Sequence, residues 1–324
     1  PELSRGLGDV YKRQSLFFAV VYLHMFRGLL YGSYQKPKEL VWIFGCTIYL
    51  AMMAEGFLGY VLPYGQMSYW GAQVIISLFG AIPYIGESLE LWVRGDYYIS
   101  GITVSRFFAL HVVALPLVLI ALVFLHLVAL HEVGAGNPEG VDIEKHLDDD
   151  GVPLDSVPFF PYKVLNALVA IGVFMTVFSI IMFFFPEGGG YFIEMANFQE
   201  ANPLVTPDHI APVWYYAPFY TMLRAIPDPL GGLIVMAAAV AIFFVVPWLD
   251  RSKVASIRYK GIYSKIAITL FGVSFLTLGY LGTVGVTEVR KLMSIICTVM
   301  YFAYFLLMPI YTKYETTKEV PERL

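Results

Sequence analysis

The stretch RFFALHVVALPLVLIALVFLHLVALHE, residues 106–132, is apolar enough to cross a membrane as a helix, yet it contains three histidines. An imidazole in the hydrocarbon core of a bilayer is costly, and such residues usually mark a functional site. His111 and His126 are 15 residues apart. On a regular helix this spacing leaves them about 60° apart around the axis and about 22 Å apart along it. Both can therefore face one side of a helix, one near each membrane surface.

The rest of the chain also has the composition of a membrane protein. Of its 324 residues, 58% are hydrophobic and 14% are charged, against roughly 25% charged residues in an average soluble domain. The net charge of −4 argues against nucleic acid as a partner. Cys46 and Cys297 lie inside separate apolar runs, so the sequence predicts no disulfide framework, redox thiol or zinc site.

Seven apolar segments are long enough to span the ~30 Å hydrocarbon core as helices. They lie near residues 15–33, 40–62, 104–130, 164–185, 229–249, 264–284 and 290–311. The predicted fold is therefore an all-α, polytopic transmembrane helix bundle. The connections 63–103 and 186–228 are long and rich in Gly, Pro and aromatic residues, so we expect surface-lying helices in them.

The distribution of Lys and Arg predicts the orientation of the bundle. Basic residues gather after the first, third and fifth predicted spans and in the C-terminal tail: Lys36, Lys38, Lys145, Arg251, Lys253, Arg258, Lys260, Lys313, Lys318 and Arg323. The opposite side has few: Arg94, Arg224, Arg290 and Lys291. We therefore expect a cytoplasmic C-terminus and two long periplasmic loops.

Two histidines this far apart along one helix indicate two separate cofactors rather than one metal ion. Haem suits such sites because its iron takes axial histidines and its rim is apolar. His24, near the cytoplasmic end of the first span, can pair with His126 across one haem. Arg27 and Arg106 stand one or two turns from these levels, where each can neutralise a haem propionate.

Gly45 and Gly59 on the second predicted span are separated by nearly the same interval as the two histidines. They are 14 residues apart, which is about 21 Å along a helix, so two flat macrocycles can approach the backbone at two depths. Ordinary helix packing is the alternative explanation for glycines in a membrane helix. Histidines that only bond neighbouring helices are likewise the alternative to haem ligands.

Several motifs now resemble one family. They are HMFRGLLYGSY (24–34), GYVLPYGQMSYWGAQVI (59–75), RFFALH (106–111), LHEVGAGNP (130–138), ANPLVTPDHIAPVWY (201–215), LRAIPDPLGG (223–232) and PWLDRS (247–252). The chain resembles cytochrome b, the core of the cytochrome bc complex or respiratory complex III, over residues 15–315. The interval between His111 and His126 is one residue longer than in mitochondrial members.

The resemblance implies two b-type haems. His24 and His126 match the ligands of the inner haem, and His111 matches one ligand of the outer haem. The position aligned with its partner ligand is Val10, which cannot bind iron. The residues that the resemblance places around the haems are Arg27, Trp42, Gly45, Gly59 and Arg106.

The first residues do not share the resemblance. Residues 1–14 match no part of cytochrome b, so we expect a foreign segment joined to a truncated gene, with seven of the family's eight spans. The expected regions are then an N-terminal haem-binding region (15–134), a cytoplasmic connecting loop (135–163) and a C-terminal region with the quinol-site loop (164–324).

The resemblance also implies two quinone sites. The outer, quinol-oxidising site maps to Phe57, Tyr60, Gly71, Pro212, Tyr215 and Tyr220. The glutamate of the family's Pro-Glu-Trp-Tyr motif is replaced by Val213. Glu55, four residues before Gly59 on the same helical face, is the candidate to accept the proton instead, or else a structural residue bonded to a neighbouring helix.

The inner, quinone-reducing site maps less completely. His131 matches a quinone-contacting histidine, and a solvated structural role is equally compatible with its place at a helix end. The family's inner-site aspartate reads as Ala167, and Lys163 stands nearby as a substitute.

The resemblance implies a catalytic membrane subunit of quinol–cytochrome c oxidoreductase in a bacterial inner membrane. One electron of each quinol would pass to a Rieske iron–sulfur protein and then to cytochrome c, and the other would cross through the two haems and reduce quinone near the cytoplasm. The Rieske protein and cytochrome c1 would be partners in a homodimeric complex that couples this transfer to proton translocation. Two other classes stay open: a different di-haem membrane anchor of a quinone-linked dehydrogenase, and a haem-free transporter with a histidine proton relay.

Overall fold

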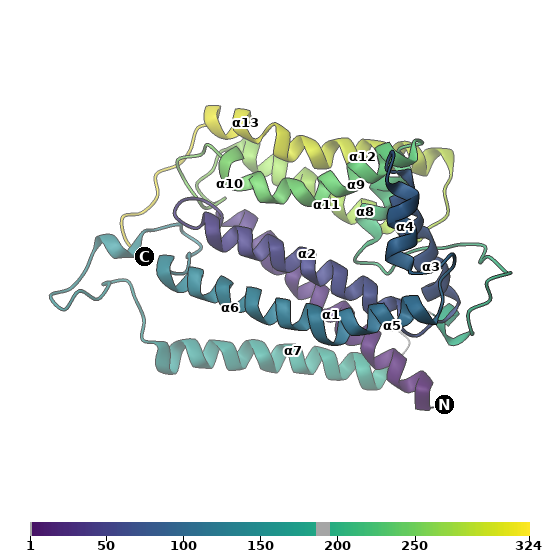
Figure 1. The fold of residues 1–324 in the computed structure, drawn as a ribbon. Helices are drawn as coiled ribbons and strands as arrows, with labels where there is room; N and C mark the ends of the chain where they lie inside the picture. Colours follow the sequence, from purple (N-terminus) through teal and green to yellow (C-terminus); the bar gives the residue numbers. More distant parts are fainter. Residues whose placement is uncertain (1, 186–194) are drawn as a thin grey trace.

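A computed structural model describes residues 2–185 and 195–324, with side chains from Gln14 onward. All the regular secondary-structure elements in this part of the chain are helices (Figure 1). Six helical stretches of the described residues are long and apolar enough to span a membrane: Glu39–Val61, Gly101–Val133, Phe159–Phe184, Pro229–Leu249, Ile262–Thr283 and Glu288–Leu306. A seventh, shorter apolar stretch, Gln14–Leu30, is the C-terminal part of α1 (Glu2–Leu30). The predicted polytopic bundle is confirmed, and each span lies within a few residues of its expected place.

The helices divide into two groups that share one core. In the first group, α1 and α2 (Glu39–Val61) lie beside the long helix made of α5 (Gly101–Ala109), η2 (Leu110–Ala114) and α6 (Leu115–Val133) (Figure 1). In the second, α8 (Ala217–Ala225), α9 (Pro229–Ala241), α11 (Ile262–Thr283) and α12 (Glu288–Leu306) pack together. Buried aromatic side chains from both groups form the shared core: Phe18, Tyr49, Tyr215, Phe219, Phe271, Tyr301 and Phe305.

One span stands apart from the others. Helix α7 (Val164–Phe184) lies beyond α1 at the edge of the bundle (Figure 1) and buries none of its residues. Its side chains are apolar all round, as expected of a helix whose surroundings are lipid or another membrane helix.

The helix ends follow local sequence signals. At α9 the Asp228 carboxylate accepts a hydrogen bond from the Gly231 N–H at 2.6 Å, and Pro229 occupies the first turn. At α5, Ser100 and Thr103 form a capping box.

Both long connections contain the expected short helices. The first folds into α3 (Gln66–Ser77), η1 (Leu78–Ala81) and α4 (Gly86–Arg94), and the described part of the second contains η6 (Met195–Phe198) and α8. None of these is long enough to span a bilayer. Gln66 joins the two connections, because its side-chain amide donates to Val205 O at 2.5 Å and accepts from the Asn202 N–H at 2.7 Å. These contacts place the two loops together at one end of the bundle.

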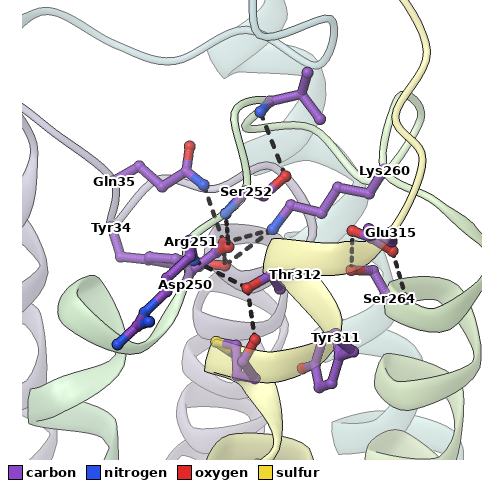
Figure 2. Close-up of polar contacts among 12 residues, drawn as sticks. Tyr34, Gln35, Asp250, Arg251, Ser252, Lys260, Ser264, Tyr311, Thr312 and Glu315 are labelled. Atoms are coloured by element: carbon purple, nitrogen blue, oxygen red, sulfur yellow. Dashed lines mark hydrogen bonds and ion pairs between the residues drawn. The ribbon is translucent and has the colours of Figure 1, made fainter.

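A buried ion pair closes the opposite end (Figure 2). The ammonium of Lys260 lies 2.5 Å from Asp250 Oδ2, and their side chains are 6% and 0% exposed. Tyr34 and Gln35, from the loop after α1, donate to the same carboxylate oxygen at 2.7 and 3.0 Å. Next to it, the Arg251 N–H donates to Thr312 of α13 (Met308–Tyr314). The PWLDRS motif therefore ties the N-terminal helices to the C-terminal ones.

Candidate functional site

The first candidate site is a cavity of about 380 Å³ between α1, α2 and α6. His24 of α1 and His126 of α6 line it, with ring centroids 6.5 Å apart and ring planes at 76°. Metal–imidazole bonds of about 2 Å put two rings that share one metal ion roughly 6 Å apart. The two rings therefore stand at the separation that a single shared iron requires.

The walls of this cavity suit a flat, mostly apolar ring with a charged edge. The His126 imidazole interacts with the backbone oxygen of Val41 on α2, and a ring nitrogen held by a carbonyl leaves the other nitrogen for a metal. Gly45 faces the His126 ring, and a Cβ there would lie 3.4 Å from its Cε1 atom. The remaining lining is largely apolar, including Val21, Met25, Val41, Ile48, Met52, Val123 and Leu130. These residues fit a haem held by two histidines.

One end of the cavity is basic. Arg27, Ser33 and Lys38 line it, and Gly136 allows the Lys38 ammonium to approach, since a Cβ there would lie 3.2 Å from Nζ. Burial lowers the pKa of Lys38, while Asp142 and Glu144 act in the opposite direction. Arg27 was predicted here. Ser33 and Lys38 were not, although the positive charge directly before the second span was visible in the sequence.

Trp42 also stands where it was expected. Its ring lines the cavity beside Gly28, and its indole N–H donates to Phe243 O at 2.7 Å. The hydrogen bond fixes the ring between the cavity and the C-terminal helices.

His111, nearer the other end of the same long helix, has different surroundings from His126. Nδ1 of His111 lies 3.0 Å from Glu55 O and 3.1 Å from Glu55 Oε1, both on α2. The ring rests on Gly59, where a Cβ would lie 2.5 Å from Cε1. A histidine that donates from Nδ1 to a carbonyl or carboxylate keeps Nε2 as its metal-binding nitrogen. His111 is the predicted iron ligand at this depth, and Val10, aligned with the second ligand, lies outside the residues whose side chains are described.

A local change of helix type reduces the angle between His111 and His126 around the helix axis. His111 belongs to the π-helical segment Leu110–Ala114, and Pro116, which has no N–H to donate, follows it. A π-helical turn takes up more residues than an α-helical turn, so it absorbs the extra residue between His111 and His126. The two histidines are thus closer to one line than the ~60° offset of a regular α-helix.

The second cavity, of about 460 Å³, lies at the end of the bundle where α3 and α8 meet α2. The predicted residues that line it are Phe57, Tyr60, Gly71, Pro212 and Tyr220, together with Val213. Its walls are almost entirely apolar, and Tyr220 donates its O–H to Ile210 O at 3.1 Å. We refer to it as the outer cavity.

The tyrosine pair after Trp214 is arranged differently from the prediction. Tyr215 is buried and stacks on Phe18, with ring centroids 4.0 Å apart, and Tyr216 lines the outer cavity in its place. Tyr216 donates to Met53 O at 2.8 Å, and Gly56 leaves room for its hydroxyl. Burial, then Tyr22 and Glu55, raise the pKa of Tyr216.

Other predicted residues stand apart from these cavities. Glu55 does not line the outer cavity, although Ala54 and Phe57 beside it do. Arg106 donates to Trp92 O at 2.9 Å and packs on Gly95, whose φ of +78° suits glycine. His131 and Lys163 are exposed at the facing ends of α6 and α7, and neither lines the two cavities described above.

Apolar cavities at two depths of a membrane helix bundle, one with paired histidines and a basic edge, define a class of polytopic membrane proteins built around ring-shaped or lipid-soluble cofactors. The sequence matches two family descriptions: "Cytochrome b(N-terminal)/b6/petB" over residues 15–218 and "Cytochrome b(C-terminal)/b6/petD" over residues 200–302. The chain belongs to the cytochrome b family, as the sequence motifs predicted.

Individual relatives agree. The chain is 55% identical to cytochrome b of Allochromatium vinosum over 96% of its own length and 77% of the relative. It is 47% identical to cytochrome b of Rickettsia bellii, over 96% and 75% of the two chains. The solved structure of a hyperthermophilic respiratory complex III superposes with a TM-score of 0.86 at 35% identity, covering 94% of this chain and 78% of that one. The chain is therefore a multi-pass subunit of respiratory complex III in a bacterial membrane.

Proposed function

We propose that this subunit oxidises quinol in the outer cavity and reduces quinone near the opposite surface, and that haem bound between the two sites would supply the electron transfer. The observation that carries the proposal is that α2 lines both cavities, at Trp42 and Gly45 in one and at Phe57 and Tyr60 in the other. Gly45 and Phe57 are 12 residues apart, which is about 18 Å of helix. One rigid element thus holds the two sites at different depths.

The inner haem site rests on side chains that the structure brings together. His24 and His126 would hold the iron, and Arg27, Ser33 and Lys38 would bind the propionates. Haem bound there supplies one-electron transfer across the membrane interior. The chain itself would fix the orientation of the haem through Trp42 and Gly45. Its basic residues at the cavity edge would compensate the negative charges of the haem propionates.

The outer cavity suits the ring of a quinol. Its apolar walls exclude water, and Gly71 leaves space beside Tyr60, where a Cβ would lie 3.5 Å from the tyrosine Cε1. Val213 cannot accept a proton. Glu55 is the carboxylate closest along α2 to the cavity residues, and we assign it two linked roles: it orients His111, and it takes up a proton from quinol oxidation. The unpartnered Oε2 atom of Glu55 supports the second role.

Quinone reduction is assigned to the opposite end, where His131 ends α6 and Lys163 precedes α7. Both are exposed there and free to meet a quinone from the bilayer. The C-terminus lies on this side, which the basic loops assign to the cytoplasm.

The proposed partners follow from the same assignment. A Rieske iron–sulfur protein and cytochrome c1 would receive electrons at the outer end, in a homodimeric complex. Membership of the cytochrome b family sets aside the two other classes considered from the sequence, the dehydrogenase anchor and the haem-free transporter.

The test is quinol–cytochrome c turnover of the complex purified from its membrane, with a reduced-minus-oxidised spectrum of the same sample. Turnover together with b-type absorbance from two haems supports the proposal. A b-type spectrum without quinol oxidation would reject it.

A further inference from the structure

The outer end of α8, α11 and α12 forms a small basic notch, separate from the outer cavity. Arg224, Arg290 and Lys291 line it together with Gly285 and Ser294. Its volume is about 20 Å³, enough for one oxygen atom of the size of a water molecule. The sequence places only four basic residues of its loops on this side of the membrane, and three of them line this one notch.

Within the described residues, the positive charges of the basic notch have no carboxylate partner. No carboxylate among the described residues forms an ion pair with any of the three side chains. Arg224 Nη2 donates to Leu281 O, and Arg290 Nη1 donates to Gly285 O, both at 2.8 Å. Each of the three side chains has further N–H groups besides these two bonds, which an anionic oxygen in the notch can use.

The surroundings of the notch are those of a lipid-facing surface. Val286, Val289, Leu292 and Met293 are exposed beside it, on or just before the first turns of α12. Basic pockets between membrane helices bind phospholipid head groups, with the acyl chains against neighbouring apolar side chains. A soluble anion would use the cations but not this apolar face.

We propose that the basic notch binds the phosphate group of an anionic phospholipid of the outer leaflet. One phosphate oxygen enters the notch, the positive charges of Arg224, Arg290 and Lys291 hold the phosphate group, and the acyl chains lie along α12. The lipid also borders the quinol site, because the Arg224 guanidinium lies 4.5 Å from the centroid of the Tyr220 ring, which lines the outer cavity.

The experiment compares lipid binding by three forms of the purified complex: wild type, Arg290→Gln/Lys291→Gln, and the control Lys253→Gln/Lys313→Gln. The control removes the same charge from exposed positions at the opposite end. Native mass spectra with added phosphatidylglycerol, with and without excess inorganic phosphate, count the bound lipids. Haem content of each form verifies assembly.

We expect the Arg290/Lys291 variant to lose one tightly bound phosphatidylglycerol per cytochrome b, with roughly 30-fold lower affinity, since each basic side chain near anionic lipid contributes about a fivefold factor. The control retains that lipid, and Arg290→Lys binds it nearly as well as wild type. Equal retention by all forms would overturn the proposal. Complete displacement of the lipid by inorganic phosphate would also overturn it, in favour of a free-phosphate site.

Discussion

The imidazole of His111 and the carboxylate of Glu55 are 3.1 Å apart, between Nδ1 and Oε1, and the same Nδ1 lies 3.0 Å from the Glu55 backbone oxygen. One residue of α2 thus presents two acceptors to one ring nitrogen. A carboxylate in this position orients a metal-binding histidine and raises its basicity. Val213 replaces the family's glutamate, and the proposed function assigns the uptake of a quinol proton to this same carboxylate.

The first prediction concerns Glu55→Gln. The amide oxygen still accepts from His111, so we expect normal haem content. It cannot take up a proton, and loss of a general base typically slows a reaction by a factor of about 10²–10⁴. Quinol–cytochrome c turnover of the purified complex measures the loss. Adding Val213→Glu should restore part of it, and normal turnover in the single variant from neutral to acid pH would show that the protons leave by another route.

The second prediction concerns the space beside Gly71. A methyl group there meets Tyr60 at an ordinary contact distance of 3.5 Å, so Gly71→Ala should keep near-normal kinetics. Gly71→Leu extends into the outer cavity and should raise the KM for quinol by about tenfold or more, since single methylene groups discriminate substrates by about 10–200-fold. Steady-state kinetics at several quinol concentrations decide this. Equal KM values for the Ala and Leu variants would place the quinol ring elsewhere.

The third prediction concerns the buried pair of Asp250 and Lys260 shown in Figure 2. Removing one partner leaves an uncompensated buried charge, which costs about 3–5 kcal/mol. We therefore expect Lys260→Met to lower the denaturation midpoint of the complex clearly. The double variant Asp250→Asn/Lys260→Met should recover much of the loss. A double variant as unstable as the single one would mean that packing, not charge, dominates here.

The same pair predicts a pH dependence. Burial would raise the pKa of Asp250, but the charge and hydrogen bond of Lys260, with the hydrogen bond from Tyr34, hold it below its ordinary value. A depressed carboxyl pKa stabilises the fold above the unfolded value of about 3.9, and the contribution is lost as the pH falls through the folded value. Denaturation midpoints of wild type and Asp250→Asn should therefore differ at pH 7 and converge below about pH 4. A constant difference would contradict the assignment.

The membrane spans were predictable because a run of about 20 apolar residues has few other structures open to it. The pairing of His24 with His126 was predictable for a related reason, since helical rise converts residue number into depth. The positions of loop side chains cannot be derived from residue spacing in this way. Tyr215 and Tyr216 are adjacent, and only the turn before α8 decides which of them reaches the outer cavity. Lys260 was counted among the basic residues of a cytoplasmic loop, and its pairing with Asp250 was not predicted because a buried ion pair leaves no periodic signal.

The most direct measurement is the haem content of His126→Ala in the purified complex, by pyridine haemochrome and redox titration, beside the exposed control His131→Ala. The structure predicts that the first variant loses the inner b haem and that the second keeps it. His24→Ala should behave like His126→Ala. Unchanged haem content in the His126 variant would contradict the assignment of His24 and His126 as ligands of one haem.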